Sequence, residues 1–233
     1  MKRIIIIGAE IGLGLGLAVE FFDRGYHVTA TCRKGDNYSN LKAIGNADPS
    51  RLAIKFVDIA DNNSVTELEG SLTGQVFDIM FYNAGIFGPM QHSLLQAKGQ
   101  LFLAALGPVR LAKRLEKFME RTGGMITFMT SNRASIADNI EGAVEFQRAS
   151  EAALNSLTRN LYFHVSKAGR SVLNVHPGCK NVDMITLNST ASHEIEPDVS
   201  VKGVADVVEE YYESGELIYV GYKDKILKWQ TNL

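Results

Sequence analysis

The chain has 233 residues, of which 45% are hydrophobic and 21% charged, and its formal net charge is −2. This composition excludes a disordered chain, because enough apolar side chains are present to form a full core. The small net charge excludes the broad positive surface that binds nucleic acid or anionic membranes, so we expect neither as a partner.

Cys32 and Cys179 have neither the spacing of metal ligands nor that of a disulfide framework, so the sequence predicts no metal site. Free cysteines fit the reducing cytoplasm, where we expect the protein to be located. The opening "MKRIIIIGAEIGLGLGLAVEFF" begins like a signal peptide, but Glu10 and Glu20 interrupt its apolar run. No other segment has the length and apolar character of a membrane span.

Short apolar runs typical of buried strands alternate with helical stretches along the chain. The strand candidates are residues 3–8, 27–32, 52–57, 77–82, 124–129, 171–176 and 216–220. The helical candidates are residues 12–24, 62–70, 91–120, 146–165 and 201–213. Continuously apolar strands are covered on both faces, and their alternation with helices indicates right-handed βαβ units. We therefore predict one domain, residues 1–233, with a Rossmann-like, doubly wound parallel α/β sheet of about seven strands and helices on both faces.

The first predicted strand runs into a glycine-rich turn, "IIIIGAEIGLG", with Gly8, Gly12 and Gly14 before a helix. Glycines at such a turn let backbone amides approach a pyrophosphate at the N-terminus of the helix. The spacing is G-x-x-x-G-x-G, and a plain glycine turn is the alternative interpretation.

Two further motifs make the pattern more specific: "VDI" at 57–59 and "YNAG" at 82–85. Together with the glycine spacing, they resemble the short-chain dehydrogenase/reductase family. The resemblance implies that Asp58 contacts the adenine of a dinucleotide. It also implies that Asn83, Ala84 and Gly85 form the wall on the adenine side of the pocket.

Later segments are similar to the sniffer-type (C-factor-like) carbonyl reductases within that family. These segments are "ATCR" at 30–33, "SIADN" at 135–139, "HPGCKNVDM" at 176–184 and "SGELIYVGYKDKILKW" near the C-terminus. The resemblance covers essentially the whole chain. It places Pro177 and Gly178 in the loop that lines the nicotinamide side of the cofactor.

Arg33 follows the second predicted strand, where an acidic residue would bind the ribose 2′-hydroxyl of NAD. A guanidinium at this position suits the 2′-phosphate instead, so NADP(H) is the expected cofactor and NAD(H) the alternative. An exposed arginine without a ligand is the competing interpretation. Glu10 lies in the glycine turn where the family has serine, and its carboxylate would repel phosphates to a degree set by distance and screening.

The family carries out carbonyl reduction with a serine, a tyrosine, a lysine and an asparagine, and this chain matches only the serine. "MTSNRASIADN" places Ser131 at the serine position. "QRASEAALNSLTR" resembles the tyrosine–lysine helix, with Gln147 and Glu151 in place of those two residues, and "LFLAALGPVR" places Ala104 at the asparagine. Glutamine has no proton of useful acidity, so ordinary carbonyl reduction should be very slow or absent.

Three functional hypotheses follow from these residues. The first is an NADP(H)-binding pseudoenzyme that senses cofactor or binds a partner. The second is an active NADP(H)-dependent oxidoreductase that acts on a small carbonyl or alcohol with non-standard residues, including Glu151 as acid or base. The third is an interaction scaffold without nucleotide, which Glu10 and Glu151 would favour. The helices near 91–120 and 146–165 form subunit interfaces in the family, so a homo-oligomer is an open alternative to a monomer.

Overall fold

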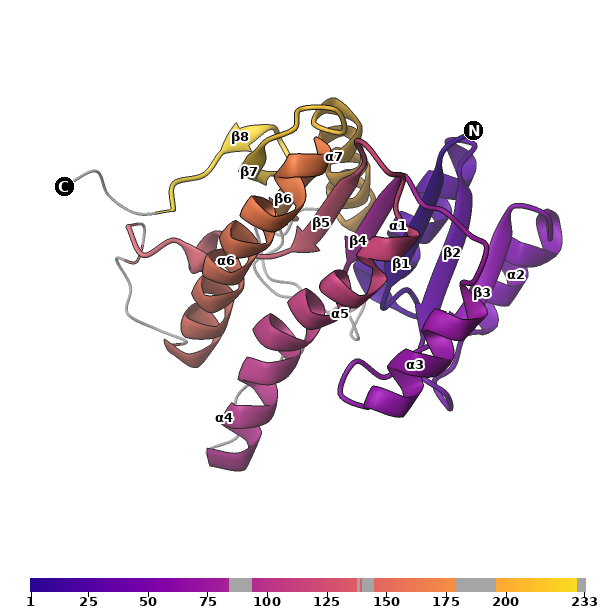
Figure 1. The fold of residues 1–233 in the computed structure, drawn as a ribbon, viewed down its shortest axis with the longest axis horizontal. Helices are drawn as coiled ribbons and strands as arrows, with labels where there is room; N and C mark the ends of the chain where they lie inside the picture. The colour runs from indigo at the N-terminus through magenta and orange to yellow at the C-terminus, as the bar shows by residue number, and fades with distance from the viewer. Residues whose placement is uncertain (84–93, 138, 140–144, 179–195, 230–233) are drawn as a thin grey trace.

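The computed structural model describes residues 1–83, 94–137, 139, 145–178 and 196–229 (Figure 1). Its described strands form one eight-stranded sheet in the order β3-β2-β1-β4-β5-β6-β7-β8. The first seven strands are parallel, and β8 pairs antiparallel with β7. The strands are β1 (Arg3–Ile7), β2 (His27–Cys32), β3 (Leu52–Phe56), β4 (Ile79–Tyr82), β5 (Met125–Met129), β6 (Ser171–His176), β7 (Leu217–Gly221) and β8 (Lys225–Ile226).

Helices cover both faces of this sheet (Figure 1). The α-helices are α1 (Gly12–Asp23), α2 (Ser39–Ala47), α3 (Asn62–Ser71), α4 (Leu94–Leu101), α5 (Gly107–Leu115), α6 (Glu145–Val165) and α7 (Pro197–Glu210). A π-helical segment, η1 (Phe102–Leu106), joins α4 to α5. Three short 3₁₀ turns are η2 (Glu116–Phe118), η3 (Asn132–Ala134) and η4 (Ser166–Ala168). None of the helices in the described ranges is long and apolar enough to cross a membrane.

The central strand β1 shows why its sequence is apolar without interruption. Ile4 and Ile6 belong to a buried cluster with α1, α2 and α7, whereas Ile5 and Ile7 belong to a second cluster with α3, α5 and α6. Successive side chains of a strand point to opposite faces, so a strand covered on both sides needs an apolar residue at every position. The predicted doubly wound sheet with two helical layers is therefore confirmed.

The seven predicted strands are all present, and β2 and β6 have the predicted bounds. The helical prediction for residues 91–120 corresponds to consecutive helical segments from Leu94 to Phe118, which change type along the way. Pro108 has no N–H to donate, and Gly107 N–H bonds five residues back to the Phe102 carbonyl, so the helical segment changes type here. Residues 91–93 of that prediction lie outside the described ranges. The sequence analysis also missed α2, which buries only Leu41, and the two-residue strand β8.

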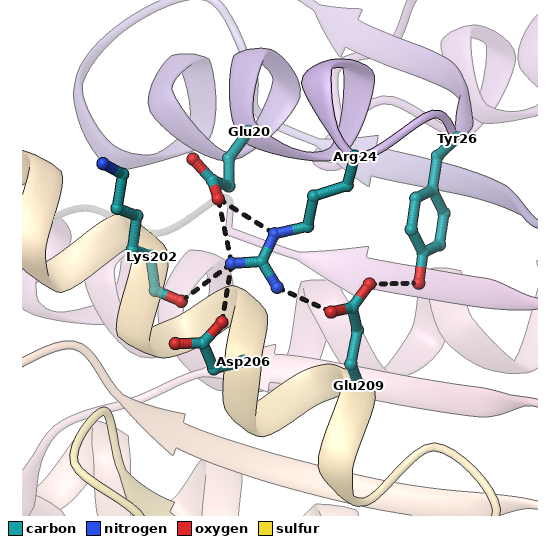
Figure 2. A network of polar contacts seen from close by, with 6 residues as sticks. All are labelled: Glu20, Arg24, Tyr26, Lys202, Asp206 and Glu209. Atoms are coloured by element: carbon teal, nitrogen blue, oxygen red, sulfur yellow. Dashed lines mark hydrogen bonds and ion pairs between the residues drawn. The ribbon is translucent and has the colours of Figure 1, made fainter.

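A cluster of polar contacts fastens α7 to the end of α1 (Figure 2). The Arg24 guanidinium donates to Glu20 at 2.9 Å, to Asp206 at 2.7 Å and to Glu209 at 2.6 Å. Glu209 also accepts a hydrogen bond from the Tyr26 hydroxyl at 2.9 Å. The Arg24 side chain is 20% exposed, so these contacts lie between surface and core. One guanidinium thus links the first helix of the chain to its last.

We predict that Arg24→Ala lowers the free energy of unfolding by about 1 to 3 kcal/mol, between the values for exposed and buried ion pairs. Urea denaturation measures the change. The matched control is Lys34→Ala, because the pair between Lys34 and Glu67 is mostly exposed, and its loss should cost less than about 0.5 kcal/mol. Equal effects of the two substitutions would contradict a stabilising role for the Arg24 cluster.

Candidate functional site

The candidate site lies at the carboxyl ends of the strands, where the order of the sheet reverses. From β1 the chain proceeds to β2 and β3 on one side, and later returns to β4 on the other. Loops after neighbouring strands diverge at such a point and leave a crevice for a ligand. The predicted residues Gly8, Asn83, Ser131 and Pro177 follow β1, β4, β5 and β6 and so share this edge.

The turn between β1 and α1 has the backbone geometry of a phosphate-binding loop. Gly8 and Gly12 have φ angles of 82° and 57°, in the region that disfavours side chains. The N-cap residue of α1 is Ile11, whose side chain makes no capping hydrogen bond, and no atom lies within 4 Å of where a Gly12 Cβ would be. Open space over uncapped amides at a helix N-terminus fits the pyrophosphate of a dinucleotide.

Gly14 allows α1 to approach β1 closely. A Cβ at Gly14 would lie 2.0 Å from the Gly8 carbonyl oxygen and 2.6 Å from Asn83 Nδ2. The Asn83 amide donates to that same carbonyl at 2.8 Å, and its backbone N–H donates to Ile7 at 3.0 Å. The structure thus brings Gly8, Gly14 and Asn83 together, whereas Ala84 and Gly85 lie outside the described residues.

Arg33 already has a partner at the position predicted for the 2′-phosphate. Its guanidinium donates from Nε to Asp36 Oδ2 at 3.0 Å and from a terminal nitrogen to Oδ1 at 3.3 Å. The Arg33 side chain is 64% exposed, so a phosphate could compete with Asp36 for it. Glu10 lies near this pair, half-buried, and its Oε2 has no hydrogen-bond partner among the described residues. Burial, with a smaller contribution from Asp36, raises the pKa of Glu10.

Asp58, the predicted adenine contact, follows β3 and is exposed. Its Oδ1 accepts a hydrogen bond from Ala60 N–H at 2.9 Å, and its own N–H donates to Ser64 Oγ at 2.8 Å. These local contacts hold the turn and leave the carboxylate at the surface beside the crevice.

Of the four positions that the resemblance assigns to the catalytic serine, tyrosine, lysine and asparagine, three form one cluster. Gln147 Nε2 donates to Glu151 Oε1 at 3.0 Å along one face of α6, as the spacing of four residues requires. The Ser131 hydroxyl, after β5, is among the groups that lower the Glu151 pKa by hydrogen bonding. Ala104 lies in η1, the π-helical segment that packs against α6. A π-helical turn inside a helix often marks a functional site.

Glu151 is an acid in an enclosed position. It is 3% exposed, and its Oε2 has no hydrogen-bond partner within the part of the chain that is described. Burial is the largest influence on its pKa and raises it. Hydrogen bonds from Gln147 and Ser131 oppose that shift, as do the charges of Arg133 and Arg148. Where a lysine would place a cation, this chain therefore places a carboxyl group that resists ionisation.

His176, the last residue of β6, and the two residues after it lie at the same edge of the sheet. Burial and the charge of Arg133 lower the pKa of His176 to about 4, so this imidazole is neutral near pH 7. Its Nδ1 has no hydrogen-bond partner among the residues described. Ser200 of α7 donates to the Pro177 carbonyl at 2.5 Å, and Gly178 has a φ angle of 85°.

The sequence analysis missed two residues that organise this cluster. Arg133 donates to Gln147 Oε1 at 2.9 Å, and the Tyr219 hydroxyl donates to the Ser131 carbonyl at 2.5 Å. Arg133 is two residues past Ser131, so a search of that loop for charges could have found it. Tyr219 is 88 residues away from Ser131, on β7, and no local signal connects them. The described residues contain no group of three or more His, Cys, Asp or Glu side chains that could hold a metal.

A parallel doubly wound sheet with a glycine turn at its switch point defines a Rossmann-type protein with a dinucleotide-binding loop. A family model for short chain dehydrogenases matches residues 2–192. The chain belongs to the short-chain dehydrogenase/reductase family, as its motifs indicated.

Solved structures agree with this assignment. A short-chain dehydrogenase/reductase from Burkholderia multivorans with bound NADP is 31% identical, with a TM-score of 0.89 over 98% of this chain and 99% of that one. A carbonyl reductase from Pseudomonas aeruginosa in complex with NADP is 29% identical, with a TM-score of 0.86 over 98% and 100% of the two chains. The carbonyl reductase Sniffer of Drosophila melanogaster shares the fold, with 24% identity and a TM-score of 0.84 over 98% and 100%.

We predict that Gly14→Ala lowers the free energy of unfolding by about 1 to 3 kcal/mol, because the new Cβ would overlap the Gly8 carbonyl. Gly70→Ala is the control, since Gly70 is also helical but has open space around its Cβ position. That substitution should be neutral or stabilise by up to about 1 kcal/mol. Thermal and urea unfolding measure both changes, and a Gly14→Ala protein as stable as the Gly70→Ala control would contradict the close packing of α1 on β1.

Proposed function

We propose that this protein binds NADP(H) and that its ordinary carbonyl or alcohol oxidoreductase activity is impaired, so that it acts as a cofactor-sensing or partner-binding pseudoenzyme. The glycine loop, with open space over uncapped amides, supports cofactor binding. Two of the similar structures contain NADP, which supports the same cofactor here. When bound, a reduced nicotinamide would supply hydride. The residues of this chain would have to supply the proton.

The observation that carries the impairment is the pair of contacts made by the Gln147 side chain. Its oxygen accepts from Arg133 and its nitrogen donates to Glu151, so both ends of the amide are held. An amide N–H is not acidic enough to protonate a carbonyl oxygen near neutral pH. Glu151 adds no positive charge that would lower the pKa of a neighbouring acid. Loss of a positioned general acid costs on the order of a hundred- to ten-thousand-fold in rate.

A second candidate function is that of an active NADP(H)-dependent oxidoreductase with non-standard residues. The buried carboxyl of Glu151, next to the retained Ser131, favours it. If the protein binds neither NADPH nor NADH, it would instead be an interaction scaffold without nucleotide.

Location in the cytoplasm, a small carbonyl or alcohol substrate and assembly into a homo-oligomer belong to the same proposal. The helices that the family resemblance assigns to a subunit interface carry large apolar side chains exposed to solvent. These are Leu101 and Leu106 near the end of α4, and Phe146 and Phe163 on α6. A second copy of the chain would cover such residues.

Calorimetric titration of nucleotide-free protein tests the cofactor. We expect micromolar binding of NADPH and binding of NADH weaker by about tenfold or more, because only NADPH offers a phosphate to Arg33. Arg33→Ala should remove the difference, and Asp36→Asn should strengthen NADPH binding by freeing the guanidinium. Arg121→Ala removes an exposed arginine elsewhere and is the control. Absence of binding to either nucleotide would refute the proposal and support the scaffold.

The impairment is tested by restoring the family's residues. Gln147→Tyr with Glu151→Lys and Ala104→Asn should raise NADPH-dependent reduction of an aldehyde by about a hundredfold or more, because it restores a positioned acid. Adding Ser131→Ala to the triple variant should remove most of the gain. A triple variant that is folded by circular dichroism yet gains nothing would count against the assignment of these positions.

A further inference from the structure

The side chains of Arg133, Gln147 and Glu151 form a chain of hydrogen bonds with one permitted direction. A guanidinium only donates, so its 2.9 Å contact identifies the facing atom of Gln147 as the amide oxygen. The amide nitrogen then faces Glu151 and donates to Oε1 at 3.0 Å. Arg133 therefore fixes which oxygen of Glu151 is an acceptor.

The other oxygen, Oε2, is buried without a hydrogen-bond partner among the described residues. A buried carboxylate oxygen without a donor is costly, whereas a protonated oxygen is itself a donor that a ligand can satisfy. Because Oε1 already accepts from Gln147, the proton of a neutral carboxyl group resides on Oε2. The arrangement leaves one buried O–H on Glu151, and the Ser131 hydroxyl interacts with the same carboxyl group.

The charges around Glu151 allow this neutral form. Burial is the largest influence on the pKa of Glu151 and raises it. The hydrogen bonds and positive charges of the neighbouring side chains lower this pKa by less; these neighbours are Gln147, Ser131, Arg133 and Arg148. On the facing strand β6, the pKa of His176 is about 4, so the imidazole adds no cation near pH 7. The packed segment η1 has the sequence FLAAL and contributes no titratable side chain.

We propose that Glu151 takes the place of the missing tyrosine as the group that gives a proton to a carbonyl oxygen held at Ser131. The inference rests on NADP(H) binding and deepens the second candidate function, with small aldehydes and ketones as the substrate class. In this proposal the Ser131 hydroxyl turns from Glu151 to donate to the carbonyl oxygen, and Glu151 Oε2 donates to the same oxygen. Arg133 and Gln147 are positioning residues, since they act through Glu151.

The step balances with a reduced nicotinamide as the hydride source. Hydride forms a C–H bond at the carbonyl carbon, and the C=O π pair moves to oxygen. That oxygen takes the proton from Glu151 Oε2, so an O–H bond breaks at Glu151 and another forms in the product alcohol. The products are an alcohol, the oxidised nicotinamide and the Glu151 carboxylate. Gln147 and the two nearby arginines stabilise this carboxylate until solvent returns a proton.

The proton on Glu151 is tested without catalysis by comparing the wild type with Glu151→Gln from about pH 5 to about pH 9. An unfolded glutamate ionises near its ordinary pKa of 4.5, while a folded state with a raised pKa keeps its proton. The stability that the wild type gains from the carboxyl group therefore falls as pH rises above that value. The urea midpoint of Glu151→Gln should increasingly exceed that of the wild type. Glu145→Gln, at an exposed position of the same helix, should track the wild type.

Catalysis is tested with benzaldehyde, diacetyl and cyclohexanone, with NADPH consumption matched to the alcohol formed. We expect slow reduction by the wild type and, at saturating NADPH, a loss of about a hundredfold or more in kcat for Glu151→Gln. The wild-type kcat should fall about tenfold per pH unit above the pKa of Glu151. Glu151→Asp should retain this pH dependence at a lower rate. Gln147→Leu should shift the pH at which kcat begins to fall, because the variant removes the hydrogen bond that Gln147 donates to Oε1 of Glu151.

The outcomes separate this inference from the proposed function. Calorimetric binding of NADPH with no alcohol from any of the three compounds, or with equal turnover by Glu151→Gln, would overturn the role of Glu151 and leave cofactor binding intact. Parallel urea midpoints for the wild type and Glu151→Gln across the pH range would overturn it as well. Failure to bind NADPH would refute the proposed function and the proton-donating role with it, while diverging midpoints would still support a protonated Glu151.

Discussion

The site depends on the close approach of helix α1 to the end of strand β1. Gly14 leaves no room for a side chain next to the Gly8 carbonyl, and Asn83 donates to that same carbonyl from the end of β4. One oxygen thus joins the two strands at which the sheet order reverses and sets the position of the helix N-terminus. Arg33, Asp58, Ser131 and Pro177 follow the other strands at this same edge of the sheet.

The two ends of the site differ in how they depart from the family pattern. At the cofactor end, Gly8, Gly14 and Asn83 lie together, and the features that would act on a bound phosphate are charges: Glu10 and the Asp36 partner of Arg33. Such partly exposed charges change the affinity for NADP(H) by modest amounts, because solvent and salt screen them. The backbone that would receive a pyrophosphate is unaffected by them.

At the catalytic end, the family resemblance assigns a tyrosine and a lysine to the positions of Gln147 and Glu151. At those positions this chain has a partly exposed amide and a buried carboxyl group. Arg133 provides a cation from a different element, and its contact with Gln147 orders the three side chains. Buried groups of this kind must satisfy one another or hold a ligand, because water cannot do so. Gln147 has a partner at each end of its amide, whereas Glu151 Oε2 has none among the described residues.

The sequence by itself determined the strand alternation, the glycine loop, and the family to which the chain belongs, because these depend on local periodicity and on motifs of adjacent residues. It also predicted that Ser131 and Glu151 share a site. It could not show that Glu151 is buried. Nor could it show the hydrogen bonds between Arg33 and Asp36 and between Tyr219 and Ser131. Burial and pairing of this kind arise from contacts between residues far apart in the chain. Only the tertiary structure decides them, because the packing of helices on the sheet sets which side chains meet and which lose their water.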